Sequence, residues 1–170
     1  MNANNTQNFD KYLPLVGRMN HAWVNTEGLL IHLIAGLSKS DIETAAATFV
    51  TLRTSDARLD LVQRLARLDH TPSAQRDDVL AVITRLKKAR KLRDRYSHCI
   101  YDFDPSAKIS EAYLTKLGER TATLKPKPAE PVGQDDAKGV TAAIKTTQAI
   151  NQSIWTLIRE YRYPAAPPET

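Results

Sequence analysis

Apolar side chains recur every three or four residues over most of this chain of 170 residues, and prolines interrupt that spacing at only a few places. A helix that buries one face needs this spacing, whereas a half-buried strand needs strict alternation. Five segments have the helical spacing: 15–37, 40–53, 55–68, 71–98 and 135–161. The sequence therefore predicts an all-α protein, a bundle of four to five helices.

Several helix ends are marked by residues that satisfy free backbone groups. Ser40 and Glu43 are spaced as a capping box, in which the serine accepts from the N3 amide and the glutamate reaches back. Ser55 is suited to cap the third helix, and Thr71 followed by a proline suits the start of the fourth. Gly36 is typical of a helix stop. These signals predict where the first helix ends and where the next three begin.

The residues after the fourth helix do not continue the helical spacing. Segment 99–108 alternates in side-chain character and meets a turn signal at 104–106, which favours a short hairpin or extended excursion. Segment 125–131 holds three prolines and predicts an exposed connector, because proline lacks a backbone donor. We expect one helical domain over residues 1–163 and a disordered tail over 164–170.

The composition suits one compact domain with a sizeable core, since 42% of the residues are hydrophobic. Cys99 is the only cysteine, so no disulfide can form within the chain, and the first residues lack the basic and apolar regions of a secretion signal. The longest apolar run, 28–37, is shorter than the roughly 20 residues that span a bilayer, and His32 interrupts it. We expect a cytoplasmic protein without a membrane segment.

Positive charge is concentrated in one run, Arg85 to Arg95, which holds seven basic residues and one acidic residue. Together with the formal net charge of +5, this run favours an anionic partner such as RNA, DNA or an acidic protein surface. His98 follows directly, so basic charge, a carboxylate and a histidine that titrates near neutral pH come together here. The run is the best candidate in the sequence for a functional site.

Helical geometry distinguishes the residues of this run, because each residue turns the side-chain direction by about 100°. An apolar stripe over 79–86 continues to Arg93, which predicts a guanidinium on the buried side of the helix. Such a group needs a structural carboxylate or a ligand phosphate, since removing it from water is costly. Asp94 and His98 are four residues apart, so the carboxylate can hold the imidazole in one tautomer.

Arg93 and His98 are five residues apart, and their directions on an ideal helix differ by roughly 140°. One straight helix does not easily aim both side chains at one phosphate. The helix can end or distort near Ser97, the arginine can bend round, or a second copy of the chain can bring its own pair across a two-fold axis. The last alternative is the most economical and predicts a symmetric homodimer.

The run Arg93-Asp-Arg-Tyr-Ser-His98 resembles the Arg-x(4 to 6)-His motif of the HEPN superfamily, in which a polar residue commonly follows the arginine, as Asp94 does here. The layout is also similar, because HEPN members are four- or five-helix bundles with the motif late in the penultimate long helix. The resemblance implies a dimer whose two motifs face a shared cleft and, in many members, a metal-independent endoribonuclease. Some members pair with an antitoxin protein and have a tyrosine two residues after the histidine, where this chain has Ile100.

In such an enzyme Arg93 would contact the scissile phosphate, and His98, tuned by Asp94, would transfer protons. The expected products are a 2′,3′-cyclic phosphate and a 5′-hydroxyl, formed without a metal or another cofactor. The neighbouring basic residues are expected to bind the RNA backbone on either side: Lys87, Lys88, Arg90, Lys91 and Arg95.

Two other functions remain open. The chain can be a HEPN-like module that binds RNA or nucleotides, or serves as a scaffold, without catalysis; it can also be a helical DNA-binding regulator that uses the basic run. A zinc site is not expected, because the histidines other than His98 lie without ligand spacing, at positions 21, 32 and 70. The largest aromatic side chains are expected to fill the core: Trp23, Trp155, Tyr96 and Tyr161.

Overall fold

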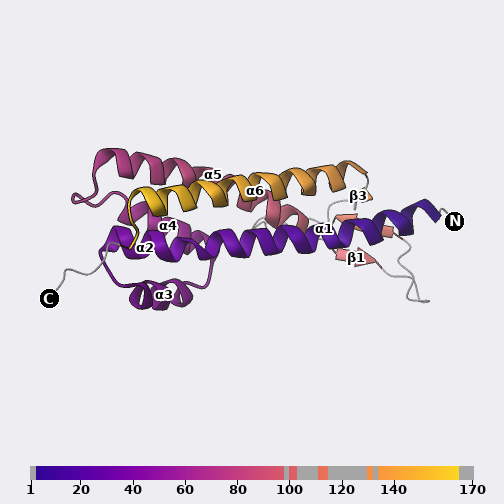
Figure 1. Cartoon of the computed structure of the whole chain (residues 1–170). Coiled ribbons are helices and arrows are strands. Elements are labelled where there is room, and N and C mark those ends of the chain that lie inside the picture. The colour runs from indigo at the N-terminus through magenta and orange to yellow at the C-terminus, as the bar shows by residue number, and fades with distance from the viewer. Residues whose placement is uncertain (1–2, 98–99, 103–110, 115–129, 132–133, 165–170) are drawn as a thin grey trace. The chain divides into compact units, whose positions relative to one another are not determined.

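The chain forms six helices in the part that the computed structural model describes, namely residues 3–97, 100–102, 111–114, 130–131 and 134–164. Side chains are described for residues 12–97 and 137–164. Figure 1 labels the helices: α1 (Ala3–Gly28), α2 (Leu30–Ser38), α3 (Ile42–Thr51), α4 (Ser55–Leu65), α5 (Ser73–Ser97) and α6 (Gln134–Glu160). The predicted all-α architecture is confirmed. Within these residues no helix has both the length and the apolar character that crossing a bilayer requires.

A short antiparallel sheet follows α5. Its strands are β1 (Ile100–Asp102), β2 (Glu111–Leu114) and β3 (Glu130–Pro131), and they lie in that order. In the β1–β2 pair, Ile100 lies opposite Tyr113 and Asp102 lies opposite Glu111. The predicted change from helix to extended structure is therefore confirmed at 100–102, whereas residue 99 and the predicted turn at 104–106 lie outside the described residues.

The predicted connector 125–131 needs a correction at its end. Its last two residues form β3, in which Glu130 pairs with Leu114 and Pro131 pairs with Tyr113. Because β3 is an edge strand, a proline is tolerated there, since one side of such a strand needs no backbone donor. Residues 125–129 lie outside the described part of the chain.

The chain divides into two compact units. Unit 1 comprises Met1–His21 and Arg90–Lys145, and unit 2 comprises Ala22–Ala89 and Thr146–Thr170. Each unit has its own cluster of buried side chains. The single domain over residues 1–163 stays a prediction, and so does the disordered tail, of which residues 165–170 lie outside the described ranges.

The first helix begins earlier than its spacing predicts. α1 starts at Ala3 rather than near Leu15, and it carries Pro14 in its interior. An interior proline costs about 3 kcal/mol, because it removes a backbone hydrogen bond. Tyr12 and Val16, on either side of the proline, are buried in unit 1, and their packing holds the helix through this position.

The prediction of one helix over 15–37 is wrong, because a tight turn at Leu29 divides this segment between α1 and α2. The amide of Leu29 donates to the carbonyl of Thr26, only three residues back, at 3.2 Å. α2 then runs through Gly36, so the stop predicted at this glycine is wrong. The helix ends instead at Ser38 and is capped by Lys39, whose φ of 55° is left-handed and whose N–H points to the carbonyls of Ala35 and Gly36.

Two helix starts lie one residue from the predicted caps. Asp41, rather than Ser40, caps α3, and its Oδ1 accepts from the Thr44 amide at 2.7 Å. This hydrogen bond is the main cause that lowers the pKa of Asp41. The ionised cap is therefore stabilising near neutral pH, and its contribution is lost as the pH falls below about 4. Thr54, rather than Ser55, caps α4 by accepting from an amide of the first turn at 3.2 Å.

α5 begins at Ser73, two residues after the predicted cap. The carbonyl of Pro72 accepts from the Arg76 amide at 2.9 Å, which is the first hydrogen bond of the helix. Thr71 is buried, and its hydroxyl donates to the carbonyl of Leu65 at 3.5 Å. The threonine therefore orders the connection between α4 and α5 instead of capping α5.

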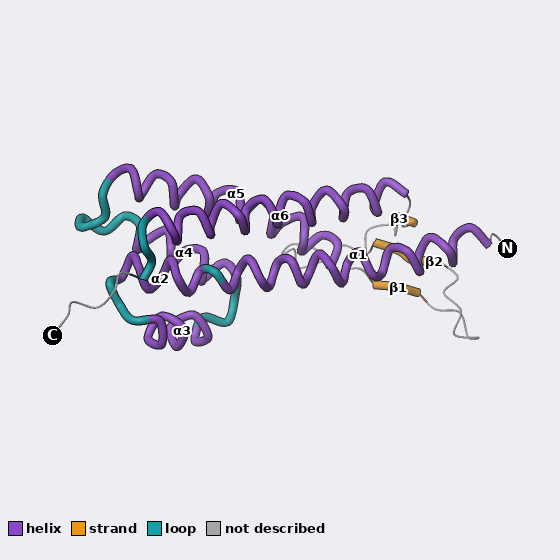
Figure 2. The backbone as a smooth tube through the Cα atoms, viewed as in Figure 1, coloured by secondary structure: helices purple, strands orange, loops and turns teal. Residues whose placement is uncertain are grey.

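Unit 2 holds the larger apolar core. All six helices contribute to it, with side chains that include Trp23, Leu30, Phe49, Leu59, Ile83 and Ile154. Figure 2 shows α3 as a short helix between two loops, and it buries Ala45 and Phe49. The prediction that Trp155 fills the core is wrong, because this side chain is 40% exposed. Its ring lies against His32, with 5.8 Å between the ring centres.

The end of α6 is held by two tyrosines of unit 2. The hydroxyl of Tyr161 donates to Oδ2 of Asp78 at 2.6 Å, and this hydrogen bond is the main cause that raises the pKa of Tyr161 to about 12. The hydroxyl of Tyr163 accepts from the side-chain amide of Gln75. Burial raises the pKa of Tyr163 to about 12, and its ring lies directly against Gly36.

Gly36→Ala is expected to destabilise unit 2, although alanine is the better helix former. A Cβ at position 36 would overlap the ring of Tyr163, and overpacking of this kind costs about 1–3 kcal/mol. The gain in helix propensity offsets only about 1 kcal/mol of that loss. Urea denaturation of both variants provides the measurement, with Gly28→Ala as the control, because a Cβ at Gly28 meets nothing within 4 Å. If the two variants have equal stability, the Tyr163 contact does not require glycine.

A partly buried ion pair joins α1 to α4 inside unit 2. Glu27 of α1 is only 6% exposed, and its Oε2 accepts from Nε1 of Trp23 at 3.2 Å. Nη1 of Arg58, from α4, lies 3.4 Å from the same oxygen. Arg58 also donates from Nε to the carbonyl of Phe49 at 3.1 Å, and its Cζ lies 4.1 Å from the centre of the Phe49 ring. One arginine thus connects α4 to α1 and α3.

Unit 1 has a smaller core around the end of α5. Tyr96 is buried there together with Tyr12, Val16, Met19, Val140 and Ala143. The Tyr96 hydroxyl lies close to Gly139 of α6, where a larger residue would meet it. Oγ of Ser97 donates to Oδ1 of Asn20, on α1, at 2.8 Å. These contacts fix the last turn of α5 within unit 1.

Candidate functional site

The basic run lies on α5, and two of its arginines are partly buried. The side chain of Arg93 is 23% exposed and that of Arg90 is 24% exposed. Tyr96, three residues after Arg93, is buried in the core of unit 1. The structure therefore places Arg93 on the partly buried side of the helix, as the apolar stripe predicts.

Asp94 supplies an anion for Arg93. Oδ1 of Asp94 lies 3.2 Å from Nη2 of Arg93, and Oδ2 lies 3.3 Å from Nη1 of Arg90. Because the three side chains remain partly exposed, each pair contributes less than about 1 kcal/mol to stability. We call these three residues the arginine cluster, in which two guanidiniums share the two oxygens of one carboxylate.

His98 lies outside the described residues, so its pairing with Asp94 stays a prediction. α5 is described as far as Ser97, so all three ways to bring Arg93 and His98 to one phosphate stay predictions. Both oxygens of Asp94 already contact arginines. If Asp94 also held the imidazole, it would have to share or release one of those contacts.

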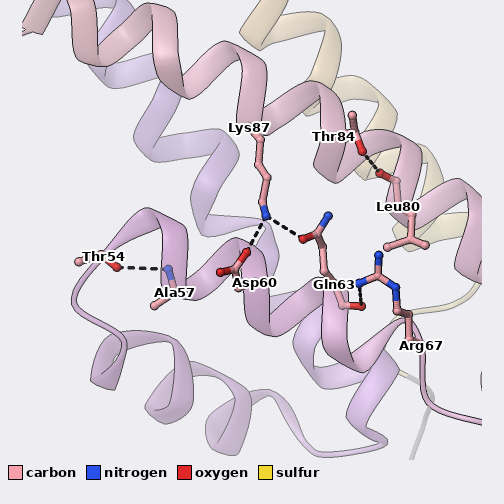
Figure 3. A network of polar contacts seen from close by, with 8 residues as sticks. All are labelled: Thr54, Ala57, Asp60, Gln63, Arg67, Leu80, Thr84 and Lys87. Carbon is pink, nitrogen blue, oxygen red and sulfur yellow. Dashed lines mark hydrogen bonds and ion pairs between the residues drawn. The ribbon is translucent and has the colours of Figure 1, made fainter. Parts of the chain in front are cut away.

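Lys87 has internal partners on α4, within unit 2. Its Nζ donates to Oδ1 of Asp60 at 2.6 Å and to Oε1 of Gln63 at 2.7 Å. Figure 3 shows the lysine reaching from α5 towards these two side chains. These contacts favour a structural role for Lys87 over the predicted role in RNA binding.

Three of the other four basic residues predicted to bind RNA lie at the surface of α5, the exception being the partly buried Arg90. Lys88, Lys91 and Arg95 are exposed. Cζ of Arg95 lies 5.7 Å from the centre of the Tyr96 ring. Lys91 and Arg95 belong to unit 1, as does the arginine cluster, whereas Lys88 belongs to unit 2. In unit 1, therefore, two exposed cations accompany the arginine cluster on the same helix.

The pairing of Arg90 with Asp94 is the feature of the site that the sequence prediction missed. The prediction pairs Asp94 with His98, four residues later, and assigns Arg90 to the RNA backbone. Arg90 lies four residues before Asp94, so the same helical spacing could have identified it as a partner. No local signal could have identified Asp60 as the partner of Lys87, because 27 residues separate them.

Among the described residues, no group of three or more His, Cys, Asp and Glu side chains is arranged to hold a metal ion. His70 belongs to the connection between α4 and α5. Its Nε2 lies 2.9 Å from the carbonyl of Leu37, near the end of α2. A surface hollow in unit 1 is lined by Ala137, Lys138, Thr141, Ala142 and Lys145 of α6. None of the three residues of the arginine cluster is among the described residues that line this hollow.

Comparison of this chain with family models, with curated proteins and with solved structures finds no match. The resemblance to the HEPN superfamily therefore rests on the sequence motif and the order of the helices.

Proposed function

We propose that this chain is a metal-independent endoribonuclease of the HEPN type, with Arg93 and His98 in its active site. The arginine cluster carries the proposal, because two partly buried guanidiniums meet one pair of anionic oxygens near the end of α5. Guanidiniums bind phosphate oxygens in the same way that they bind carboxylate oxygens. The cluster is therefore suited to a scissile phosphate, and His98 follows it closely in the chain.

In the proposed reaction an imidazole takes the proton of the RNA 2′-hydroxyl, whose oxygen then attacks the adjacent phosphorus. The bond from phosphorus to the 5′-oxygen breaks, and that oxygen receives a proton. A homodimer with a shared cleft would supply the two imidazoles that these proton transfers need, one of them from His98 of the partner subunit. Arg93 would stabilise the negative charge that develops on the phosphate oxygens.

The RNA backbone on either side would be held by exposed cations of α5. Lys91 and Arg95 lie on the helix that carries the arginine cluster, and both belong to unit 1. Phosphate contacts of this kind add affinity without reading the base sequence. We therefore expect binding that weakens with salt and has little sequence preference.

The test is cleavage of single-stranded RNA by the full-length protein in excess EDTA, with analysis of the product ends. We expect 2′,3′-cyclic phosphate and 5′-hydroxyl ends, and no cleavage of RNA whose 2′-oxygens are methylated. Equal cleavage by the wild type and by His98→Ala, at the same RNA and salt, would contradict the proposal. Light scattering should give a mass of two chains, and an active monomer would exclude a second imidazole from the partner.

A second candidate function is binding of RNA or nucleotides without catalysis. The observation that favours it is that both Asp94 oxygens contact arginines, because Asp94 would have to share or release one of these contacts to hold His98 in one tautomer. A module of this kind would protect bound RNA and release it uncut. Binding that is sensitive to salt, together with no cyclic-phosphate product, would identify it.

A further inference from the structure

The carboxylate of Asp94 lies between the guanidiniums of Arg90 and Arg93 and contacts both. Oδ1 of Asp94 lies 3.2 Å from the guanidinium of Arg93, and Oδ2 lies 3.3 Å from the guanidinium of Arg90. Two adjacent oxygens of a phosphate group present the same charge and similar spacing to a pair of guanidiniums. A phosphate and the Asp94 carboxylate would therefore compete for the same donors.

The contacts of Asp94 are of a kind that a polyanion can replace. All three side chains are partly exposed, and ion pairs at such positions are weak and are screened by salt. The exposed cations Lys91 and Arg95 lie on the same helix in unit 1, so the local charge attracts an RNA backbone. Asp94 can also turn outward without emptying a core position, because its side chain is 31% exposed.

We propose that Asp94 is an internal competitor that occupies the phosphate position of Arg90 and Arg93 until an RNA phosphate displaces it. The proposal rests on the proposed function in taking RNA as the ligand. It differs from the role predicted from the sequence, in which Asp94 orients His98. It assigns to Arg90 a direct contact with the bound phosphate, next to that of Arg93.

Removing the charge of Asp94 should therefore strengthen RNA binding. The measurement is fluorescence anisotropy with a labelled 2′-O-methyl RNA, which has no free 2′-hydroxyl, so binding is read without cleavage. We expect Asp94→Asn to bind about five- to tenfold more tightly than the wild type at low salt, with a difference that shrinks as salt rises. Unchanged or weaker binding overturns the proposal, as does the absence of binding by both proteins.

Asp77→Asn is the matched control. Asp77 also lies on α5 and pairs with its neighbour, since Oδ1 is 2.9 Å from Nε of Arg76, so the variant changes the net charge equally. We expect it to bind within about twofold of the wild type. If Asp77→Asn strengthens binding as much as Asp94→Asn, a general charge effect explains the result and the proposal is wrong.

A double-variant background tests whether Asp94 acts through the two arginines. In a protein with Arg90→Gln and Arg93→Gln, adding Asp94→Asn should give no gain in affinity, and a gain that persists contradicts the proposal. Asp94→Ala serves as a second variant, and circular dichroism melts establish that each protein is folded. If the variants show the expected binding but the wild type does not cleave RNA, the proposed endoribonuclease activity is wrong and the proposed competition by Asp94 stands. If the wild type cleaves RNA but Asp94→Asn does not change binding, the proposed competition is wrong and the proposed activity stands.

Discussion

Replacing Arg93 with glutamine is expected to slow RNA cleavage about a hundredfold or more, because the transition state loses a charged donor at the scissile phosphate. Glutamine keeps a polar side chain at the partly buried position but cannot neutralise phosphate charge. The loss should appear mainly in kcat if the guanidinium acts on the transition state, and in KM if it only binds the backbone. Single-turnover and steady-state cleavage of one RNA, under the same salt, provide the measurement.

Arg76→Gln is the control for this result. Arg76 lies in the first turns of the same helix, is paired with Asp77, and is outside the arginine cluster. The chemical change is identical, so cleavage by this variant should remain close to the wild-type rate. If Arg93→Gln cleaves as well as Arg76→Gln does, Arg93 has no part in catalysis.

Replacing Arg58 with methionine is expected to lower the free energy of unfolding by about 3 kcal/mol, because Glu27 would keep its buried charge without its partner. The same change removes the hydrogen bond to the Phe49 carbonyl and the contact over the Phe49 ring. Methionine retains most of the apolar volume of the arginine stem, so a cavity does not explain the loss. Urea denaturation, followed by circular dichroism, gives the difference in stability.

The double variant Glu27→Leu with Arg58→Met should recover much of this loss, because a buried pair replaced by apolar side chains leaves no unpaired charge. Arg67→Met is the control on the surface of unit 2. Arg67 is exposed and donates to the carbonyl of Gln63 at 3.2 Å, so its removal should cost less than about 0.5 kcal/mol. A single variant Arg58→Met as stable as Arg67→Met would show that the Glu27 charge does not depend on Arg58.

Much of the helical architecture could be predicted from spacing alone. In α6 the helical period includes Thr147, and this threonine is buried, as Val140 and Ile150 are. The backbone repeat sets such a pattern within one segment, so no other part of the chain needs to be known. The same repeat predicts the partly buried position of Arg93.

Helix ends and special residues were harder to predict, because distant contacts override local signals. Gly36 has the chemistry of a helix stop, yet its place inside α2 is explained by the ring of Tyr163, far away in the chain. Pro14 is unfavourable inside a helix, yet α1 continues through it with Tyr12 and Val16 buried on either side. Trp155 has the size of a core residue but is partly exposed beside His32.

The sequence by itself determined the all-α class, the basic run on one helix, and the side of that helix on which Arg93 lies. These properties depend on neighbours within two turns, whose relative directions the backbone sets. Only the tertiary structure decided that Lys87 pairs with Asp60 and that Arg58 neutralises Glu27. The partners in such pairs lie tens of residues apart in the chain, so the pairs form only when the helices that carry them pack together. Charge and spacing along the chain do not specify which helices pack together.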